Sequence, residues 1–249
     1  MTFSTAHLLM QWVRRDFRVK YTQTALGSFW ALAQPIALTA TFVILMHNIA
    51  GLKAGVPYAS FVLPGMLVWT LFSGGVTGGV GAMASSMFIA SKAHYPRVVA
   101  PISGALLPFV DVLAGLLLLP VLFVIQGTPA RFAPLPFVLA LLGTLTLSIG
   151  LSSMLSAMAI FVRDVRNVLP LLLQLLLLLT PVAFPASRLP HVLGLNPMAT
   201  FVEGFRSSML PVNAPTVTEW LRSWAVAGLS LAIGIWYFHR VEHRFADVA

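Results

Sequence analysis

The sequence predicts an all-α, polytopic membrane protein, for three reasons. Apolar residues make up 58% of the 249 residues and charged residues only 9%, against about 25% charged in soluble domains. The mean hydropathy is +0.90. Long windows without charge alternate with short clusters of Lys and Arg. A water-soluble globule of this length could not bury so much apolar surface, so this surface must face lipid.

Six charge-poor windows predict six transmembrane helices within a single transmembrane domain, residues 1–249. A charge at the bilayer centre costs at least about 2.5 kcal/mol, and about 20 apolar residues cross the hydrocarbon. The fourth window opens with APLP, which favours a helix start, and Pro181 and Pro185 shorten the helix of the fifth. The predicted spans lie at about residues 29–49, 61–83, 102–125, 135–160, 168–184 and 224–238.

The distribution of Lys and Arg predicts that both termini are cytoplasmic. This orientation places ten cations inside and five outside, as the positive-inside rule requires. The first apolar run begins after residue 20 and is longer than the roughly 7 to 15 residues of a signal-peptide core. We therefore expect it to be retained as the first span.

An amphipathic helix is predicted before the first span, over residues 4–22. Leu9, Val13 and Phe17 recur every four residues and share one face. This pattern is typical of a helix in the membrane interface, with its cations toward lipid phosphates or a partner protein. The alternative is an anchor that only fixes orientation. The cations concerned are Arg14, Arg15 and Arg18.

Close helix packing is predicted for the second span. Its sequence GGVTGGVG places Gly74 with Gly78, and Gly75 with Gly79, one helical turn apart. Small residues at this spacing let another helix approach closely. We therefore expect a neighbouring helix to lie against this face.

Asp111 is the only acidic residue inside a predicted span. A carboxylate at that depth must be paired, hydrated or protonated, which makes it a functional candidate. No second intramembrane acid, lysine or histidine completes a proton relay, apart from His47 near the end of a span. The favoured interpretation is a structural polar contact. A secondary transporter or channel that uses Asp111 is the alternative.

A re-entrant or interfacial helix is predicted on the outer side, between the fifth and sixth spans. Asn196 is suited to cap a helix that starts at Pro197. One face is apolar, and the opposite face carries Thr200, Glu203 and Arg206 with Ser207. Such a helix could cover a pore mouth, and an inert loop helix is the alternative. The apolar stripe comprises Met198, Phe201, Val202, Phe205 and Met209. The predicted outer gate residues are Asn196, Phe201, Glu203, Phe205 and Arg206.

Enzymatic and metal chemistry find no support in the sequence. The chain has no cysteine, and we find no G-x-S-x-G elbow. His239, Glu242 and His243 spell H-x-x-E-H, but we interpret them as the charged exit of the last helix, without a third ligand. The net charge of +8 is explained by membrane orientation, so nucleic-acid binding is not expected. We assign no catalytic, cofactor-binding or metal-binding residue.

Four blocks of the sequence resemble the membrane subunit of polysaccharide-exporting ATP-binding cassette transporters, which export O-antigen, capsule or teichoic acid chains. The blocks occur in the family's order and together cover nearly the whole chain. They are RDFRVKYTQTALGSFWALAQP, FVRDVRNVLPLLLQLLLLLTPVAFP, LNPMATFVEGFRSSML and YFHRVEHRFADVA. The resemblance implies a six-span permease of the bacterial inner membrane that pairs with a second copy of itself, binds two copies of a separate ATPase subunit and moves a lipid-linked glycan.

The resemblance also implies that ATP and Mg²⁺ are bound by the partner subunit, so that this chain is not the enzyme. The residues agree, because the phosphate-binding pattern G-x-x-x-x-G-K-[ST] is absent. By position, the N-terminal helix would rest on the ATPase. The family's coupling helix would fall in the loop between the second and third spans. A plain cytoplasmic loop is the alternative there. The implied coupling residues are Lys92, His94, Tyr95 and Arg97, together with Arg14, Arg15 and Arg18.

In this family the channel lies between the two copies, lined largely by the first and fifth spans and closed outside by helices after the fifth. Aromatic side chains suit a glycan path, because their faces stack on the apolar faces of sugar rings. The candidates are Trp30, Phe42, Phe72 and Phe184, for which lipid-facing or core packing is the alternative. We therefore predict an ATP-driven polysaccharide export permease. An intramembrane enzyme is a third reading, which lacks paired carboxylates or a metal cluster.

Overall fold

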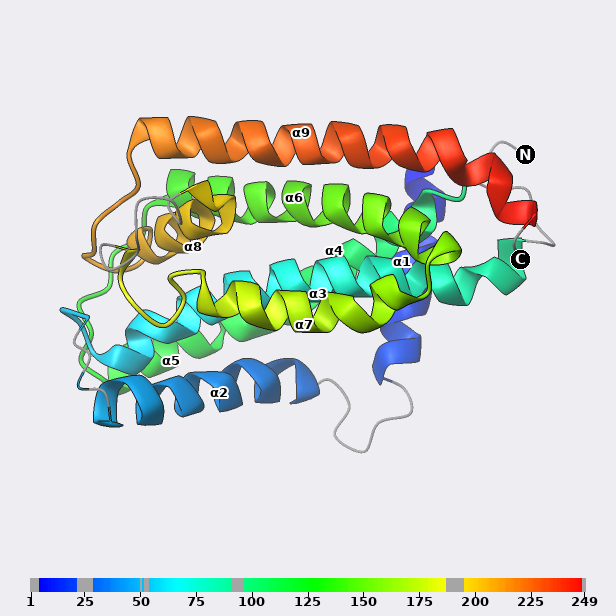
Figure 1. The fold of residues 1–249 in the computed structure, drawn as a ribbon. Coiled ribbons are helices and arrows are strands. Elements are labelled where there is room, and N and C mark those ends of the chain that lie inside the picture. The colour runs from blue at the N-terminus through cyan, green and yellow to red at the C-terminus, as the bar shows by residue number, and fades with distance from the viewer. Residues whose placement is uncertain are drawn as a thin grey trace.

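The computed structural model describes residues 5–21, 29–49, 51, 54–90, 96–186 and 195–247. Within these residues the chain forms helices and no strands, which confirms the predicted all-α class. Five of these helical segments are long and apolar enough to cross a membrane. The long helices lie side by side along one axis (Figure 1).

Helix α3 (Tyr58–Ala90) is the centre of the bundle. Its membrane-spanning window is 78% buried, against 11% for the window formed by α2 (Trp30–Phe42) and the π-helix η2 (Val43–Ile49). Two helices, α4 (Val99–Leu116) and α6 (Pro134–Phe161), pack along α3. The main hydrophobic core therefore follows α3, with the first span at the periphery.

The glycines of α3 bring these helices close together. A Cβ atom on Gly78 would lie 2.6 Å from the carbonyl oxygen of Gly104 in α4. One on Gly79 would lie 2.5 Å from the Cβ of Ser152 in α6. The other two glycines of the motif also face α4 and α6. This arrangement confirms the predicted small-residue packing.

The long helix α9 (Val217–Val241) packs on α6 by the same means. A Cβ atom on Gly150 would lie 2.5 Å from the backbone nitrogen of Leu231, and one on Gly234 would overlap the carbonyl of Gly150. Buried hydroxyls in α6 donate to carbonyls within their own helix, as Thr144 does to Ala140 at 2.7 Å. Polar side chains in this tight interface are thereby satisfied locally.

The predicted span at 102–125 consists of two helices, α4 and α5 (Leu118–Ile125). Pro120 has no N–H to donate to the carbonyl of Leu116, which interrupts the helical ladder there. The turn tightens at the break, where Leu117 N–H donates to the carbonyl of Ala114 at 3.1 Å. Together the two segments still form one spanning length, Val99–Ile125.

Helix α7 (Asp164–Leu178) stands where the fifth span was predicted, and it is short. Its 15 residues make a helix about 22 Å long, less than the roughly 30 Å of the hydrocarbon core. Residues 179–184 form turns rather than continuing the helix to 184. The six predicted spans thus correspond to five full-length segments and one short helix in the described part of the chain.

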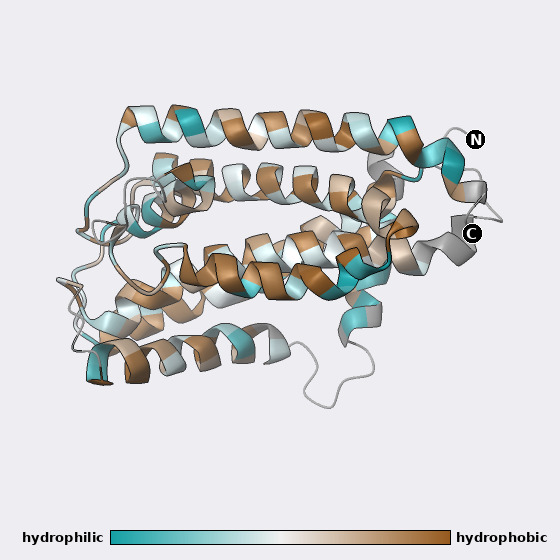
Figure 2. Ribbon diagram, viewed as in Figure 1, coloured by the Kyte–Doolittle hydropathy of each residue, from teal (hydrophilic) through white to brown (hydrophobic). Residues whose placement is uncertain are grey.

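The two ends of the bundle differ. At one end, α1 (Thr5–Tyr21) runs across the other helices, near the point where α9 finishes in the 3-10 helix η5 (Glu242–Asp247) (Figure 1). At the opposite end lies α8 (Pro197–Ser207). We call these the α1 end and the α8 end. Hydrophobic residues dominate the long helices, and hydrophilic residues gather on α1 and near the ends of α9 (Figure 2).

Candidate functional site

Helix α8 begins as its sequence predicts. The side-chain oxygen of Asn196 accepts a hydrogen bond from the N–H of Met198 at 3.0 Å, and Pro197 is the first helical residue. The Asn196 amide also donates to the hydroxyl of Thr180 at 2.9 Å. The cap is confirmed, and it links the start of α8 to the end of α7.

Both faces of α8 are buried. The apolar stripe includes Phe201, Val202 and Phe205, each with no exposed surface. The polar side is nearly as enclosed, with Thr200 5% exposed and hydrogen-bonded by Ser223 of α9 at 2.8 Å. Helix α8 is therefore surrounded by α3, α6 and α9. It does not lie on the protein surface, as an interfacial helix would.

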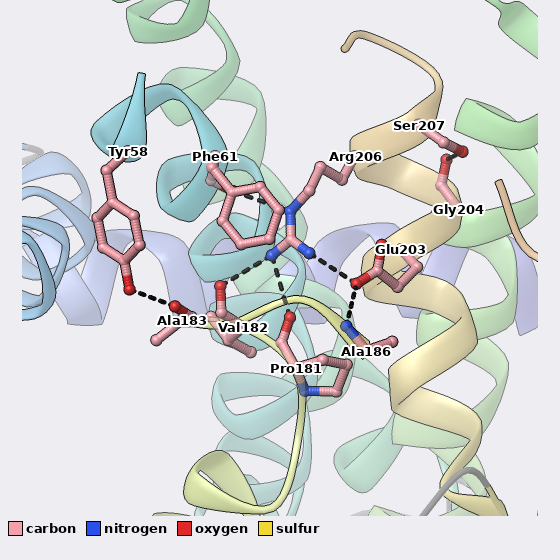
Figure 3. A network of polar contacts seen from close by, with 10 residues as sticks. All are labelled: Tyr58, Phe61, Pro181, Val182, Ala183, Ala186, Glu203, Gly204, Arg206 and Ser207. Carbon is pink, nitrogen blue, oxygen red and sulfur yellow. Dashed lines mark hydrogen bonds and ion pairs between the residues drawn. The ribbon is translucent and has the colours of Figure 1, made fainter. Parts of the chain in front are cut away.

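Arg206 is the largest fully buried side chain of the described residues. Its Nε donates to the carbonyl of Phe61 at 2.9 Å, and its Nη2 donates to the carbonyls of Pro181 and Val182 at 3.1 and 2.8 Å (Figure 3). Its Nη1 binds the carboxylate of Glu203 at 3.0 Å. The guanidinium also lies 3.7 Å from the ring centroid of Phe61. Arg206 thus joins α8, α3 and the turn after α7.

Burial and ion pairing act in opposite directions on Arg206. Removal from water lowers the pKa of its guanidinium, whereas Glu203 and then Tyr58 raise this pKa. Because a guanidinium stays protonated in proteins, the buried side chain carries a full positive charge. Its cost is offset by the carboxylate and three carbonyl acceptors.

Tyr58 and Glu203 hold the same turn at two further points. The Tyr58 hydroxyl donates to the carbonyl of Ala183, and the N–H of Ala186 donates to the Glu203 carboxylate at 3.2 Å (Figure 3). We call Tyr58, Phe61, Glu203 and Arg206, with the backbone of residues 181–186, the Arg206 network. It fixes the turn after α7 against α3 and α8.

The network leaves little room for a substrate at Arg206. A Cβ atom on Gly65 would lie 2.7 Å from Nη2 of Arg206, so a glycine is required beside the guanidinium. Because its donors already meet acceptors of this chain, Arg206 positions α8 rather than offering a ligand site. The predicted gate residues other than Phe205 and Phe201 are thus brought together with the turn at 181–186 by polar contacts.

The sequence alone did not reveal the partners of Arg206. Tyr58 and Phe61 were interpreted only as part of the second span, and the carbonyls of Pro181 and Val182 have no sequence signal. One local signal was available, because Glu203 and Arg206 stand three residues apart, a spacing that pairs opposite charges on a helix. The side chains from α3 are 145 residues away in sequence.

At the α1 end, Asp111 has a partner. Its carboxylate forms an ion pair with Lys20 of α1, and Asp111 is 7% exposed. A second link joins the same two helices, where the Ser103 hydroxyl donates to Asp16 at 3.0 Å. Asp111 therefore makes a structural polar contact that attaches α1 to α4.

We expect Lys20→Met to detach α1 from α4 more than the double variant Lys20→Met/Asp111→Asn. The single change leaves a buried carboxylate without its lysine, which costs about 1–3 kcal/mol, whereas the double change removes both charges. Hydrogen exchange of α1 measures the effect. Arg14→Met, an exposed cation of the same helix, is the control. Equal exchange in the single and double variants would contradict the structural role of the pair.

The predicted coupling residues have different surroundings. Lys92, His94 and Tyr95 lie outside the described residues. Arg14 and Arg18 are exposed on α1, and Arg15 binds the adjacent Asp16 at 2.7 Å. Arg97 donates to the carbonyl of Glu242 at 2.8 Å, which ties it to the end of α9. Arg97 is therefore engaged within the chain, and it is not a free contact for a partner as predicted.

The four aromatic channel candidates are also dissimilar. Trp30 is 55% exposed on α2. Phe42 and Phe184 are partly buried. Phe72 is 1% exposed and packs against Trp69 at 5.5 Å between ring centroids. The assignment of Phe72 to a channel wall is therefore wrong, because its side chain fills the core around α3.

The described residues contain no group of three or more His, Asp or Glu side chains that could hold a metal ion. In the H-x-x-E-H segment, Nδ1 of His239 lies 3.0 Å from the Glu242 carboxylate, in an exposed pair at the chain's α1 end. This local contact satisfies the histidine without a metal.

The fold and the site define a class. Several apolar helices of spanning length surround a central helix, and the buried polar groups at both ends make interhelical contacts. The protein is therefore a multi-pass membrane protein whose polar residues fasten mobile-length segments, α1 and α8, to the bundle. The chain belongs to the ABC-2 type transporter family, which it matches over residues 7–210.

Relatives of this chain are similar along nearly its full length. An O-antigen export system permease protein, RfbA, from Klebsiella pneumoniae is 23% identical over 97% of this chain and 94% of its own length. A protein with the same description from Myxococcus xanthus is 25% identical over 96% and 94%. The polysialic acid transport protein KpsM from Escherichia coli is 26% identical over 79% of each chain.

Proposed function

We propose that this chain is the transmembrane subunit of an ATP-driven exporter that moves a lipid-linked polysaccharide across the bacterial cytoplasmic membrane. The observation that carries the proposal is the full-length similarity to permeases described as exporting O-antigen, at 96–97% of this chain. The polysialic acid transport protein extends the similarity to a second glycan. All these relatives are described as moving polysaccharide.

The working unit in this proposal is a homodimer with two ATPase subunits, which bind ATP and Mg²⁺. Exposed apolar side chains on α2 and α7 support a second copy, among them Trp30 and Ile36 on α2 and Leu171 and Leu175 on α7. These are the helices at the first and fifth predicted spans. A glycan channel between two copies would be lined by such faces, with the α8 end outside and the α1 end in the cytoplasm.

Positive charge supports the proposed orientation. Within the described residues, the α1 end carries the cations of α1 together with Arg163, Arg166 and Arg240. Helices with cation-rich ends orient with those ends in the cytoplasm. The buried ion pair of Asp111 supports a structural role for this carboxylate, so we do not favour a secondary transporter that uses it.

The proposal is tested by purifying the full chain with and without the ATPase subunit encoded beside it. We expect a stable complex whose ATP turnover in liposomes rises when the lipid-linked glycan is added. The chain alone should bind no nucleotide and move no glycan. Failure to form a complex with any ATPase would refute the proposal, as would glycan transport by the chain alone.

The exposed cations of α1 give a narrower test. We expect Arg14→Glu/Arg18→Glu to weaken ATPase binding at least tenfold, because reversed charges at an interface repel their partners and each tenfold loss is about 1.4 kcal/mol. The matched control is Arg14→Lys/Arg18→Lys, which keeps both charges. Affinity is measured by titrating the ATPase onto the detergent-solubilised chain. Unchanged affinity in the charge-reversal variant would remove α1 from the interface.

A further inference from the structure

An apolar pocket opens near the α8 end, on a part of the molecule that the proposed function does not use. Its volume is about 590 Å³, within the roughly 300–1,000 Å³ of sites that hold small ligands. Its walls come from α4, α5, the start of α6 and the residue pair after α8. None of the lining residues belongs to α2 or α7. Lining residues include Leu119, Phe123, Phe132, Phe137 and Met209.

The surroundings of the pocket face hydrocarbon. Val124, Ile125 and Leu135, on the two helices that border it, are 82%, 76% and 69% exposed. Exposed apolar side chains in such density indicate contact with lipid tails rather than water. A pocket that opens on this surface is therefore reached from the bilayer.

One cation stands at the rim. Arg131 lines the pocket and lies in the connection between α5 and α6, which is where the chain leaves the hydrocarbon at this end. Its Nη2 donates to the carbonyl of Ser207 at 3.2 Å. No carboxylate among the described residues forms an ion pair with it. The guanidinium is thus held in place by a neutral acceptor and keeps its full charge for an anion.

The rim is also rigid. The N–H groups of Arg131 and Ala133 donate to the carbonyls of Met209 and Ser208 at 2.9 and 2.8 Å. Phe137 stacks on Phe205 of α8, with ring centroids 5.1 Å apart. The backbone around Arg131 is therefore fixed to the end of α8, which orients the guanidinium beside the pocket mouth.

We propose that this pocket binds an anionic phospholipid of the bilayer, with an acyl chain in the apolar pocket and its phosphate on Arg131. The two parts of the site match the two parts of such a lipid in chemistry and in order along the membrane normal. Arginine binds phosphate through paired N–H donors. A lipid that carries an ammonium beside its phosphate would place like charge next to Arg131, so a net negative headgroup is preferred.

The site can be tested on the full chain in detergent, with phosphatidylglycerol as the probe. Native mass spectrometry should show one retained lipid per chain, and titration should raise the thermal unfolding midpoint. We expect dioleoylglycerol, which lacks the phosphate, and inorganic phosphate, which lacks the chains, each to bind at least tenfold more weakly. Equal binding of either would overturn the proposal.

Three variants locate the site. Arg131→Gln removes the charge, and Ala130→Trp, at an exposed position that lines the pocket, fills it. Each should weaken phosphatidylglycerol binding at least tenfold. Arg131→Lys should restore most of the affinity, which separates loss of charge from misfolding. Arg166→Gln, an exposed cation on α7, is the matched control and should bind like the unaltered chain.

Two results would refute the assignment. Unchanged binding in Arg131→Gln or Ala130→Trp would place the lipid elsewhere. Tighter binding of a polyprenyl phosphate than of phosphatidylglycerol would identify the occupant as a carrier lipid of cargo instead of a bilayer phospholipid.

Discussion

Replacing Arg206 with methionine is expected to destabilise the protein by about 3–5 kcal/mol. This is the range for removing one partner of a buried ion pair. The change leaves the Glu203 carboxylate without its cation and leaves the carbonyls of Phe61, Pro181 and Val182 without their donors. The free energy of unfolding in mixed detergent micelles measures the loss. Hydrogen exchange should rise first in residues 181–186.

Two further variants separate charge from geometry. Arg206→Met/Glu203→Gln removes the unpaired carboxylate and should recover part of the loss, since only the carbonyl acceptors remain unmet. Arg206→Lys keeps the charge but lacks the fork of donors that reaches several acceptors at once, so we expect an intermediate stability. Arg166→Met, at an exposed position, is the control. A stability of Arg206→Met equal to that of this control would show that the network contributes nothing.

Replacing Gly234 with leucine should separate α9 from α6. A Cβ at this position overlaps the carbonyl of Gly150, and backbone atoms have no flexible end that could move aside. Overpacking in cores costs about 1–3 kcal/mol and occasionally more, and we expect the upper part of that range because two backbones must part. The thermal unfolding midpoint in detergent measures the change.

Gly228 is the matched control for this prediction. It lies in the same helix, and a Cβ added there meets nothing within 4 Å. Gly228→Leu should therefore be neutral or slightly stabilising, because leucine is the better helix former in a spanning helix. Equal destabilisation of the two variants would mean that helix propensity, and not the approach of α6, decides the outcome.

Hydropathy predicted most of the helices because each reports its own surroundings. The windows at 61–83 and 135–160 became α3 and α6, and both helices extend beyond the predicted bounds. Local chemistry also predicted the cap at Asn196. The fifth span was placed too far along the chain, since the turn that follows Leu178 comes before Pro181. Prolines indicate that a helix ends but not at which residue.

The candidate site was only half visible in the sequence. Asp111 was recognised as a residue that needs a partner, yet Lys20 is 91 residues away. The buried face of α8 was predicted from its apolar stripe, but the polar face was expected to differ and is buried too. Phe72 and Trp30 show why: both are aromatic residues in apolar windows, and one is 1% exposed whereas the other is 55% exposed.

Composition and periodicity by themselves determined that this chain spans a membrane, where its helices run and which of them pack closely through glycine. Tertiary structure decided which faces meet. In a lipid solvent, a side chain that faces a neighbouring helix and one that faces the bilayer are equally apolar, so hydropathy does not distinguish them. The partners of Arg206 and Asp111 follow from the packing of the whole bundle, because three of the four groups that bind the buried guanidinium are backbone carbonyls.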